Sequence, residues 1–211
     1  MTETMTMNRV IHAAVRRDLT RLETALAAFP DGDAERAAAL RRAQTYLRDE
    51  LTRHHVGEDT LIWPMLASVG VDQALLTTME SEHHAMAESL TTLDAAMERL
   101  VAEPTAASAA AARTVVADTR EVVDQHLAHE ERDLEPVLLP HLDSPEWHAV
   151  EKQLRKAPPR VAGEFFAWIQ DGQGEAEATY LRATVPAPVV LVLSRVFGRG
   201  YHRHVAPVWR A

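Results

Sequence analysis

The sequence nearly repeats itself at a spacing of about 72 residues, and the repeated positions carry metal-binding side chains. Each half contains an isolated histidine, then a His-x-x-x-Glu motif, and then a proline six residues after the glutamate. The matching positions are His12 and His83, His54 and His126, Glu58 and Glu130, and Pro64 and Pro136. Two such halves facing each other supply four imidazoles and two carboxylates. The repeat therefore predicts a dinuclear metal site rather than a site for a single ion.

Glycine and proline divide residues 1–140 into four long segments, and an N-capping side chain stands before three of them. The breaks fall near Gly32, Gly70, Pro104 and Pro140, and the caps are Asp33, Asp72 and Thr105. Composition agrees with helices, because only 8 Gly are present and Ala, Leu, Arg and Glu are abundant. These features predict an all-α fold for residues 1–140.

Each segment carries apolar residues at alternating spacings of three and four, which predicts one inward face per helix. Four such faces make an antiparallel up-down four-helix bundle. The predicted inward residues are His12, Val15, Leu19, Leu22 and Leu26; Leu47, Leu51, His54, Glu58, Leu61 and Met65; Leu76, Met79, His83, Met86, Leu90, Leu93, Met97 and Leu100; and Val116, Thr119, Val123, His126, Glu130, Leu134 and Val137.

Six ionisable residues interrupt these apolar faces at matching levels. A single buried histidine is usually explained by an ordinary hydrogen bond in the core. Buried charges, however, are normally paired or bound to a metal. Because all six recur in register, we interpret them as ligands: His12, His54, Glu58, His83, His126 and Glu130.

Three further histidines lie close to these positions in the sequence. Adjacent helical residues point about 100° apart. His55 and His84 therefore fall on polar helix faces, and His129 lies with other polar residues. We expect these three side chains to be solvated or to lie behind the ligands.

Residues 8–140 resemble the hemerythrin-like (HHE cation-binding) family. The resemblance is carried by the stretches IHAAVRRDL, RHHVGEDTLIWPML, SEHHAM and DQHLAHEERDLEPVL. Ferritin-like proteins instead use Glu-x-x-His motifs, which give a site richer in oxygen. The resemblance implies a non-haem di-iron centre with an oxo or hydroxo bridge that binds dioxygen, nitric oxide or peroxide. By the resemblance, one iron is held by His12 and His54, the other by His83 and His126, and both are bridged by Glu58 and Glu130.

The sequence departs from the oxygen-carrying members in two places. Those proteins have a fifth histidine one turn further along the third helix, where this chain has Ala87. Tyr46, another side chain or water is left to fill that position. Their last carboxylate lies five residues after the fourth-helix histidine, which here is Glu131, whereas the internal repeat and the inward face favour Glu130. A less saturated ion favours peroxide turnover over reversible oxygen binding, because catalytic metals keep an open position.

Composition narrows the class of protein further. The absence of Cys leaves nitrogen and oxygen ligands, which suit iron, manganese or zinc. A formal charge of −9 argues against nucleic acid or an anionic membrane as the main partner. The N-terminal MTETMTMNRV does not resemble a signal peptide, and the apolar run at residues 189–193 is far shorter than the roughly 20 residues that span a bilayer. We therefore expect a cytoplasmic protein.

Residues 141–211 are predicted to form a helical extension packed on the bundle. Ser144 and Pro145 read as an N-cap and a first helical residue. Helices are expected from there to about Ala157 and over residues 161–169, 175–184 and 189–197. The basic, aromatic end contains His202 and His204 without acidic residues at helical spacing, so we expect it to fold against the bundle rather than to bind metal.

These features predict a di-iron protein that binds or activates dioxygen, peroxide or nitric oxide. Redox turnover, either of peroxide or of a small organic substrate, is one possibility left open. Non-catalytic binding or sensing of oxygen or nitric oxide is a second. A structural bundle with a zinc or manganese site is the alternative from a different class, since sites of nitrogen and oxygen ligands accept several metals.

Overall fold

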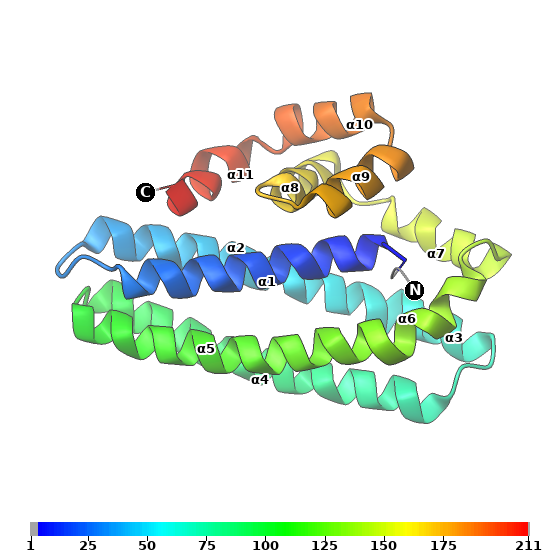
Figure 1. Ribbon diagram of the computed structural model, residues 1–211, viewed down its shortest axis with the longest axis horizontal. Helices are drawn as coiled ribbons and strands as arrows, with labels where there is room; N and C mark the ends of the chain where they lie inside the picture. The colour runs from blue at the N-terminus through cyan, green and yellow to red at the C-terminus, as the bar shows by residue number, and fades with distance from the viewer. Residues whose placement is uncertain (1–3, 211) are drawn as a thin grey trace.

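The structure is a computed structural model that describes residues 4–210. The outer ends of the two predicted regions, residues 1–3 and 211, lie outside the described residues. The largest part is a bundle of four long antiparallel helices (Figure 1): α1 (Met7–Ala27), α2 (Ala34–Gly57), α4 (Gln73–Ala102) and α5 (Ala106–His129). Helix α1 contacts α2 and α5, and α4 contacts the same two helices. The predicted all-α bundle is confirmed, and residues 4–210 contain no strand.

The helices begin where the capping residues predict. The side chains of Asp33, Asp72 and Thr105 each accept a hydrogen bond from a backbone N–H in the first turn of α2, α4 and α5. Gly32 and Gly70 have φ values of 83° and 88° in the connecting loops. A left-handed backbone of this kind favours glycine, which explains why both loops carry one.

The core lies along the predicted inward faces. All eight predicted residues of α4, from Leu76 to Leu100, are buried, and so are the five of α1. On α2 and its continuation, His54 and Leu61 are only half-buried. The apolar pattern therefore identified the bundle interior correctly over most of its length.

A π-helical turn at Glu58–Ile62 follows α2 and leads into α3 (Trp63–Ser68). Pro64 explains the wider turn. Its nitrogen has no hydrogen to donate, and its ring would clash with the carbonyl four residues earlier in an α-helix. The chain widens instead, and the Trp63 N–H bonds to the carbonyl of Glu58.

The second half repeats this turn at Glu130–Leu134, before α6 (Glu135–Leu138), and Pro136 has the same role. A π-helical turn contains more residues than an α-helical turn, so the residues that follow it are rotated about the axis. The prediction that Val137 continues the inward face is wrong for this reason, since its exposed fraction is 36%.

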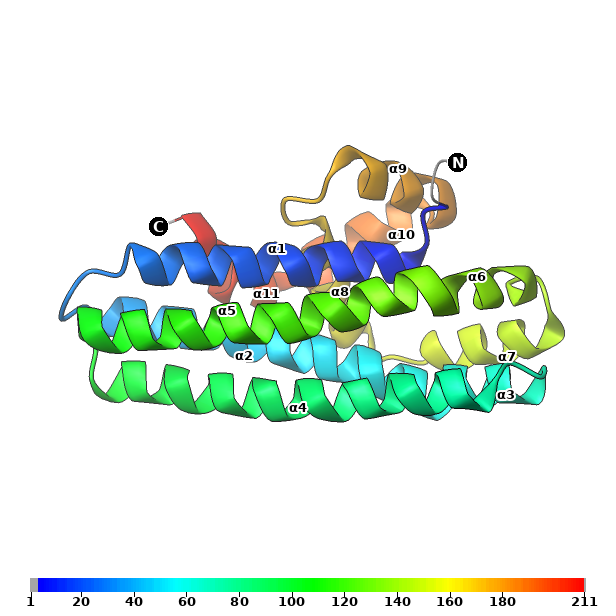
Figure 2. The same ribbon diagram turned by 60° about the horizontal axis from the view of Figure 1, so that its bottom comes forward.

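The extension after the bundle is also helical. Three of its helices lie over the face formed by α1 and α2, as Figures 1 and 2 both show, and α8, α9 and α11 contact one or both of these helices. Its elements are a 3₁₀ turn (Leu139–His141), α7 (Pro145–Leu154), α8 (Pro159–Gln170), α9 (Glu175–Thr184), α10 (Ala187–Val192), a π-helical turn (Leu193–Phe197), α11 (Arg199–His204) and a 3₁₀ segment (Ala206–Arg210).

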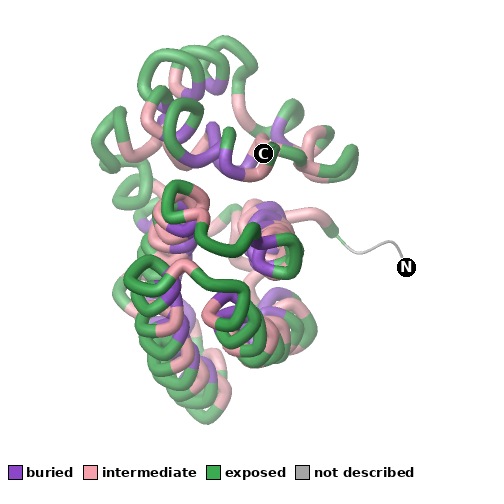
Figure 3. The backbone as a smooth tube through the Cα atoms, turned by 90° about the vertical axis from the view of Figure 1, so that its left-hand side faces the viewer, coloured by how far each residue is buried: buried purple, intermediate pink, exposed green. Residues whose placement is uncertain are grey.

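Buried polar contacts join the extension to the bundle. The indole N–H of Trp168 donates to Asp18 at 2.8 Å, and both side chains are 0–1% exposed. Arg36 donates to the carbonyl of Val208 at 2.7 Å. Seen from the end (Figure 3), buried positions of the extension turn toward the bundle. His202 and His204 are exposed.

Within residues 4–210, no single helix combines the length and the apolar character needed to cross a bilayer. A bent pair, Glu175–Thr184 with Ala187–Phe197, meets that requirement by length and composition only, with an angle of 112° between its members.

Candidate metal centre

The four helices bring their histidines and glutamates together at one level of the bundle. One group consists of His12 from α1, His54 from α2 and Glu130 after α5, whose ligand atoms lie within 4.8 Å of one another. The Nε2 atoms of His12 and His54 are 3.4 Å apart, and Glu130 Oε2 is 3.2 Å from His12 Nε2. Two nitrogens that bind one ion at about 2.1 Å with a right angle between them lie about 3 Å apart, so this spacing suits a shared ion.

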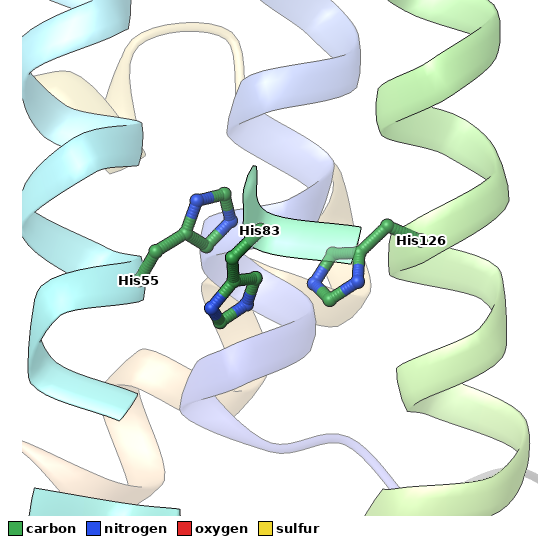
Figure 4. A group of neighbouring side chains, drawn as sticks. All are labelled: His55, His83 and His126. Carbon is green, nitrogen blue, oxygen red and sulfur yellow. The ribbon is translucent and has the colours of Figure 1, made fainter. Parts of the chain in front are cut away.

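The second group consists of His55, His83 and His126, whose ligand atoms also lie within 4.8 Å of one another. Figure 4 shows the three imidazoles converging from α2, α4 and α5. The rings of His55 and His83 are nearly parallel, with centroids 4.2 Å apart. All three residues are buried. These two groups share no residue, and a third group, His54, His55 and Glu58, contains one histidine from each of them.

Both glutamates lie between the two groups. Glu58 Oε1 is 3.2 Å from His54 Nε2, whereas Glu58 Oε2 is 3.5 Å from His83 Nε2. Glu130 Oε2, which contacts the first group, lies 3.8 Å from His126 Nε2. Each carboxylate therefore faces both groups, as a carboxylate that bridges two ions must.

Outer carboxylates fix the orientation of three imidazoles. Because a carboxylate only accepts, each contacting Nδ1 carries the proton and each Nε2 is left to face the centre. Metal-binding histidines in proteins are held by outer carboxylates in the same way. The pairs are His12 Nδ1 with Glu131 at 2.8 Å, His83 Nδ1 with Asp59 at 2.8 Å, and His126 Nδ1 with Glu82 at 2.9 Å.

Two of these outer carboxylates were present in the sequence repeat but were not recognised as a pair. Asp59 and Glu131 are offset by the same 72 residues as Glu58 and Glu130, and each directly follows one of these candidate ligand glutamates. Glu131 was considered only as an alternative ligand to Glu130. The structure places Glu130 in the ligand group and Glu131 on the outer nitrogen of His12, where Arg16 also contacts it at 2.7 Å.

Asn8 holds the other oxygen of Glu130. Its amide, one turn before His12 on α1, donates to Glu130 Oε1 at 2.9 Å. This contact leaves Oε2 as the oxygen that points at the histidines. The sequence offered no signal for Asn8 beyond its spacing of four residues from His12.

Several polar atoms at the centre are buried without a hydrogen-bond partner. Among the described residues these include His55 Nε2, Glu58 Oε2, His83 Nε2, His126 Nε2 and Glu130 Oε2. Leaving so many acceptors unsatisfied in one place would cost several kcal/mol. Cations at the centre would satisfy all of them, because each is a nitrogen or oxygen that metals accept. The residues present therefore fit a metal centre.

The electrostatics of the carboxylate pair also favour a cation. Burial and the negative charge of Glu130 raise the pKa of Glu58 well above its ordinary value. Burial alone would raise the pKa of Glu130 too, but the contact with His12 and the neighbouring imidazoles lower it. Burial would lower the pKa of His12, yet Glu130 and Glu131 raise it. Without a metal, the site must take up protons to balance two buried carboxylates.

Three of the other imidazoles have lowered pKa values and are therefore neutral without a metal. Burial, followed by the proximity of His12, lowers the pKa of His54 to about 3. Burial likewise lowers the pKa of His55 and of His126. The neutral imidazole is the form that binds metal ions, so the site presents its ligands ready for binding at neutral pH.

The three neighbouring histidines differ from one another. The expectation that His55 lies on a polar, solvated face is wrong, because its side chain is buried, and it belongs to a group that could hold a metal ion. His84 is exposed, and its Nδ1 bonds to the carbonyl of Glu80. His129 lies behind the centre, where it contacts Glu82 at 2.7 Å. Tyr46 packs against the extension, with its ring centroid 5.1 Å from that of Tyr201.

A four-helix bundle whose interior holds histidines and glutamates around unsatisfied ligand atoms is a cation-binding bundle. A comparison with protein families agrees with this class, since residues 8–138 match the Hemerythrin HHE cation binding domain. The match covers more than half of the chain, and the chain therefore belongs to this family. Searches of curated proteins and of solved structures found no match.

The metal-free protein should lose stability as the pH falls below about 6.5. The unfolded chain takes up protons there on His54, His55 and His126, whose pKa values are lowered in the folded state. Glu58 and His12 act in the opposite sense, since both pKa values are raised in the folded state. The raised pKa of His12 has its effect above pH 6.5, where the unfolded histidine loses its proton, so below pH 6.5 Glu58 alone opposes the three histidines. We expect the unfolding free energy of chelator-treated protein to fall by roughly 1–3 kcal/mol per pH unit. Urea titrations at about pH 7 and pH 5.5 would measure it, and an unchanged slope in a His54→Gln, His55→Gln double variant would contradict the assignment.

The outer carboxylates should set metal affinity without changing how many ions bind. Glu131→Gln and Asp59→Asn remove the charge that faces Nδ1 of His12 and of His83. Loss of such partners typically lowers metal affinity by about 10–100-fold. Competition with a chromophoric chelator would measure the change. Asp49→Asn is the matched control, since Asp49 pairs with Arg48 on the surface, and equal affinities in all three variants would show that the outer carboxylates have no such role.

Proposed function

We propose that the protein is a non-haem di-iron hemerythrin-like protein that binds or activates dioxygen, peroxide or nitric oxide. The observation that carries the proposal is the pair of ligand groups, His12–His54–Glu130 and His55–His83–His126, with Glu58 between them. Two groups that share no residue, linked by carboxylates, suit two ions rather than one. Family membership supports cation binding at this place.

Iron is the metal that we propose, as an oxo- or hydroxo-bridged pair. The ligand atoms are imidazole nitrogens and carboxylate oxygens, which non-haem iron accepts. His12 and His54 would hold one ion and His83 and His126 the other, with Glu58 and Glu130 between them. When bound, the two irons would supply the electrons and the coordination positions that a diatomic molecule or a peroxide requires.

The chain orients the imidazole ligands and surrounds the centre with apolar side chains that limit the access of water. The outer carboxylates hold three imidazoles with Nε2 toward the centre. Met79 and Met86, each about one turn from His83 on α4, are completely buried, and Trp63 lies against His83 with ring centroids 5.9 Å apart. Such a lining limits the access of water and strengthens electrostatic interactions at the centre. It favours small ligands over large ones.

Peroxide turnover is the activity that we propose to test first within this function. The position that provides the fifth histidine in oxygen-carrying relatives is Ala87 here, on the exposed side of α4. The expectation of a less saturated ion therefore stays a prediction. Reversible binding of oxygen or nitric oxide without turnover is the competing outcome.

Metal analysis is the direct test of the dinuclear site. We expect about two irons per chain and the visible absorption of an oxo-bridged pair after anaerobic reconstitution and exposure to air. Replacing His54 and Glu130 together by Ala removes two members of one ligand group and should reduce the iron content to one or fewer. His84→Gln is the control, because His84 is exposed and should leave the loading unchanged. Full loading of the double variant, or stoichiometric zinc or manganese in place of iron, would contradict the proposal.

Rapid mixing with hydrogen peroxide would separate turnover from binding. If the protein disproportionates peroxide, we expect many equivalents of oxygen per di-iron centre, measured with an oxygen electrode. The His54→Ala, Glu130→Ala variant should lose this activity to the level of free iron. A reduced wild-type protein that only forms a stable oxygen adduct, and consumes no peroxide, would identify a binding protein instead.

A further inference from the structure

We propose that His55 is a fifth imidazole ligand and binds the same ion as His83 and His126. The inference rests on the dinuclear site of the proposed function and adds a residue that the His-x-x-x-Glu motifs do not include. It assigns different ligands to the two ions: three imidazoles on one, two imidazoles with Glu130 on the other.

The position of α2 lets two adjacent histidines serve two different ions. Helix α2 contacts α1 on one side and α4 on the other. Adjacent helical residues point about 100° apart, so two such side chains rarely reach one ion. Here His54 faces α1, with its Nε2 3.4 Å from that of His12, and His55 faces α4, with its ring stacked on His83.

The surroundings of His55 are those of a ligand and not of an ordinary core histidine. Its exposed fraction is 7%, and its Nε2 is buried without a hydrogen-bond partner. Buried polar groups in folded proteins are normally satisfied. His54 and Glu58 also have ligand atoms within 4.8 Å of a nitrogen of His55, but His54 Nε2 faces His12. The other such group of His55 consists of His55, His83 and His126, and the Nε2 atoms of His83 and His126 are also unpartnered. A shared ion would satisfy all three nitrogens together.

A second pair of adjacent histidines provides an internal comparison. His83 and His84 are not the repeat equivalents of His54 and His55, since Leu127 stands at the position of His55, but they too are a ligand candidate followed by a second histidine. Yet His84 is exposed, and its Nδ1 bonds to the carbonyl of Glu80 in its own helix. The histidine pair alone therefore does not bury its second member. His55 is buried because α2 has bundle neighbours on the side toward which His55 points.

The test uses the full-length protein reconstituted with iron. We expect Mössbauer spectra of the wild type to resolve two inequivalent irons, and pulsed electron–nuclear spectroscopy of the mixed-valent form to count five coordinated imidazoles. In His55→Ala, the signal of one iron should change, and a chelator should remove that iron at least about tenfold faster, since even outer-shell losses weaken binding about 10–100-fold. Added imidazole should restore the wild-type spectrum. His84→Ala should behave as the wild type.

The outcomes separate this inference from the proposed function. Two irons with four coordinated imidazoles in the wild type would overturn the role of His55 and leave the di-iron proposal standing. A His55→Ala variant with unchanged spectrum and chelator resistance would do the same. A wild type that holds fewer than two ions would overturn both. The imidazole count is made on the wild type, so it decides the question even if His55→Ala folds poorly.

Discussion

The interior of this bundle depends on placing two carboxylates among imidazoles where water is scarce. Glu58 and Glu130 are each 1–2% exposed and lie close enough for the charge of one to raise the pKa of the other. Burial of unpaired charge is costly, and the cost falls when cations or protons balance it. The outer carboxylates Glu131, Asp59 and Glu82 add further negative charge around the histidines. A bundle with this interior is stabilised by what binds there as well as by its apolar core.

Two prolines determine the backbone conformation at the candidate metal centre. Pro64 and Pro136 each force a π-helical turn that begins at a site glutamate. Such turns are frequent at functional sites because they redirect side chains within an otherwise regular helix. In both halves the turn also presents the next acidic residue, Asp59 or Glu131, to the isolated histidine of the other half. One short motif therefore supplies a ligand and the partner of another ligand.

The sequence predicted the bundle well because its apolar spacing and capping residues are local signals. The buried face of α4 and the caps Asp33 and Asp72 are confirmed. The burial of two residues, Val137 and His55, was predicted wrongly, in each case for a physical reason. Val137 follows the π-helical turn, which rotates the helix phase, and a pattern of constant period does not include that rotation. His55 lies on a face that is polar in sequence, but α4 covers that face, and only tertiary packing shows this.

The sequence repeat is nearly symmetric, whereas the folded centre is not. The extension lies over α1 and α2 through contacts such as Trp168 with Asp18, while α4 and α5 keep a surface free of it in Figures 1 and 2. The repeat also has Leu127 at the position that corresponds to buried His55, so only one half supplies this histidine. Two equal halves would give two equivalent ions. With His55 as a ligand, as we propose, one ion would instead be richer in nitrogen than the other, and such a difference would let a small ligand distinguish between the two ions.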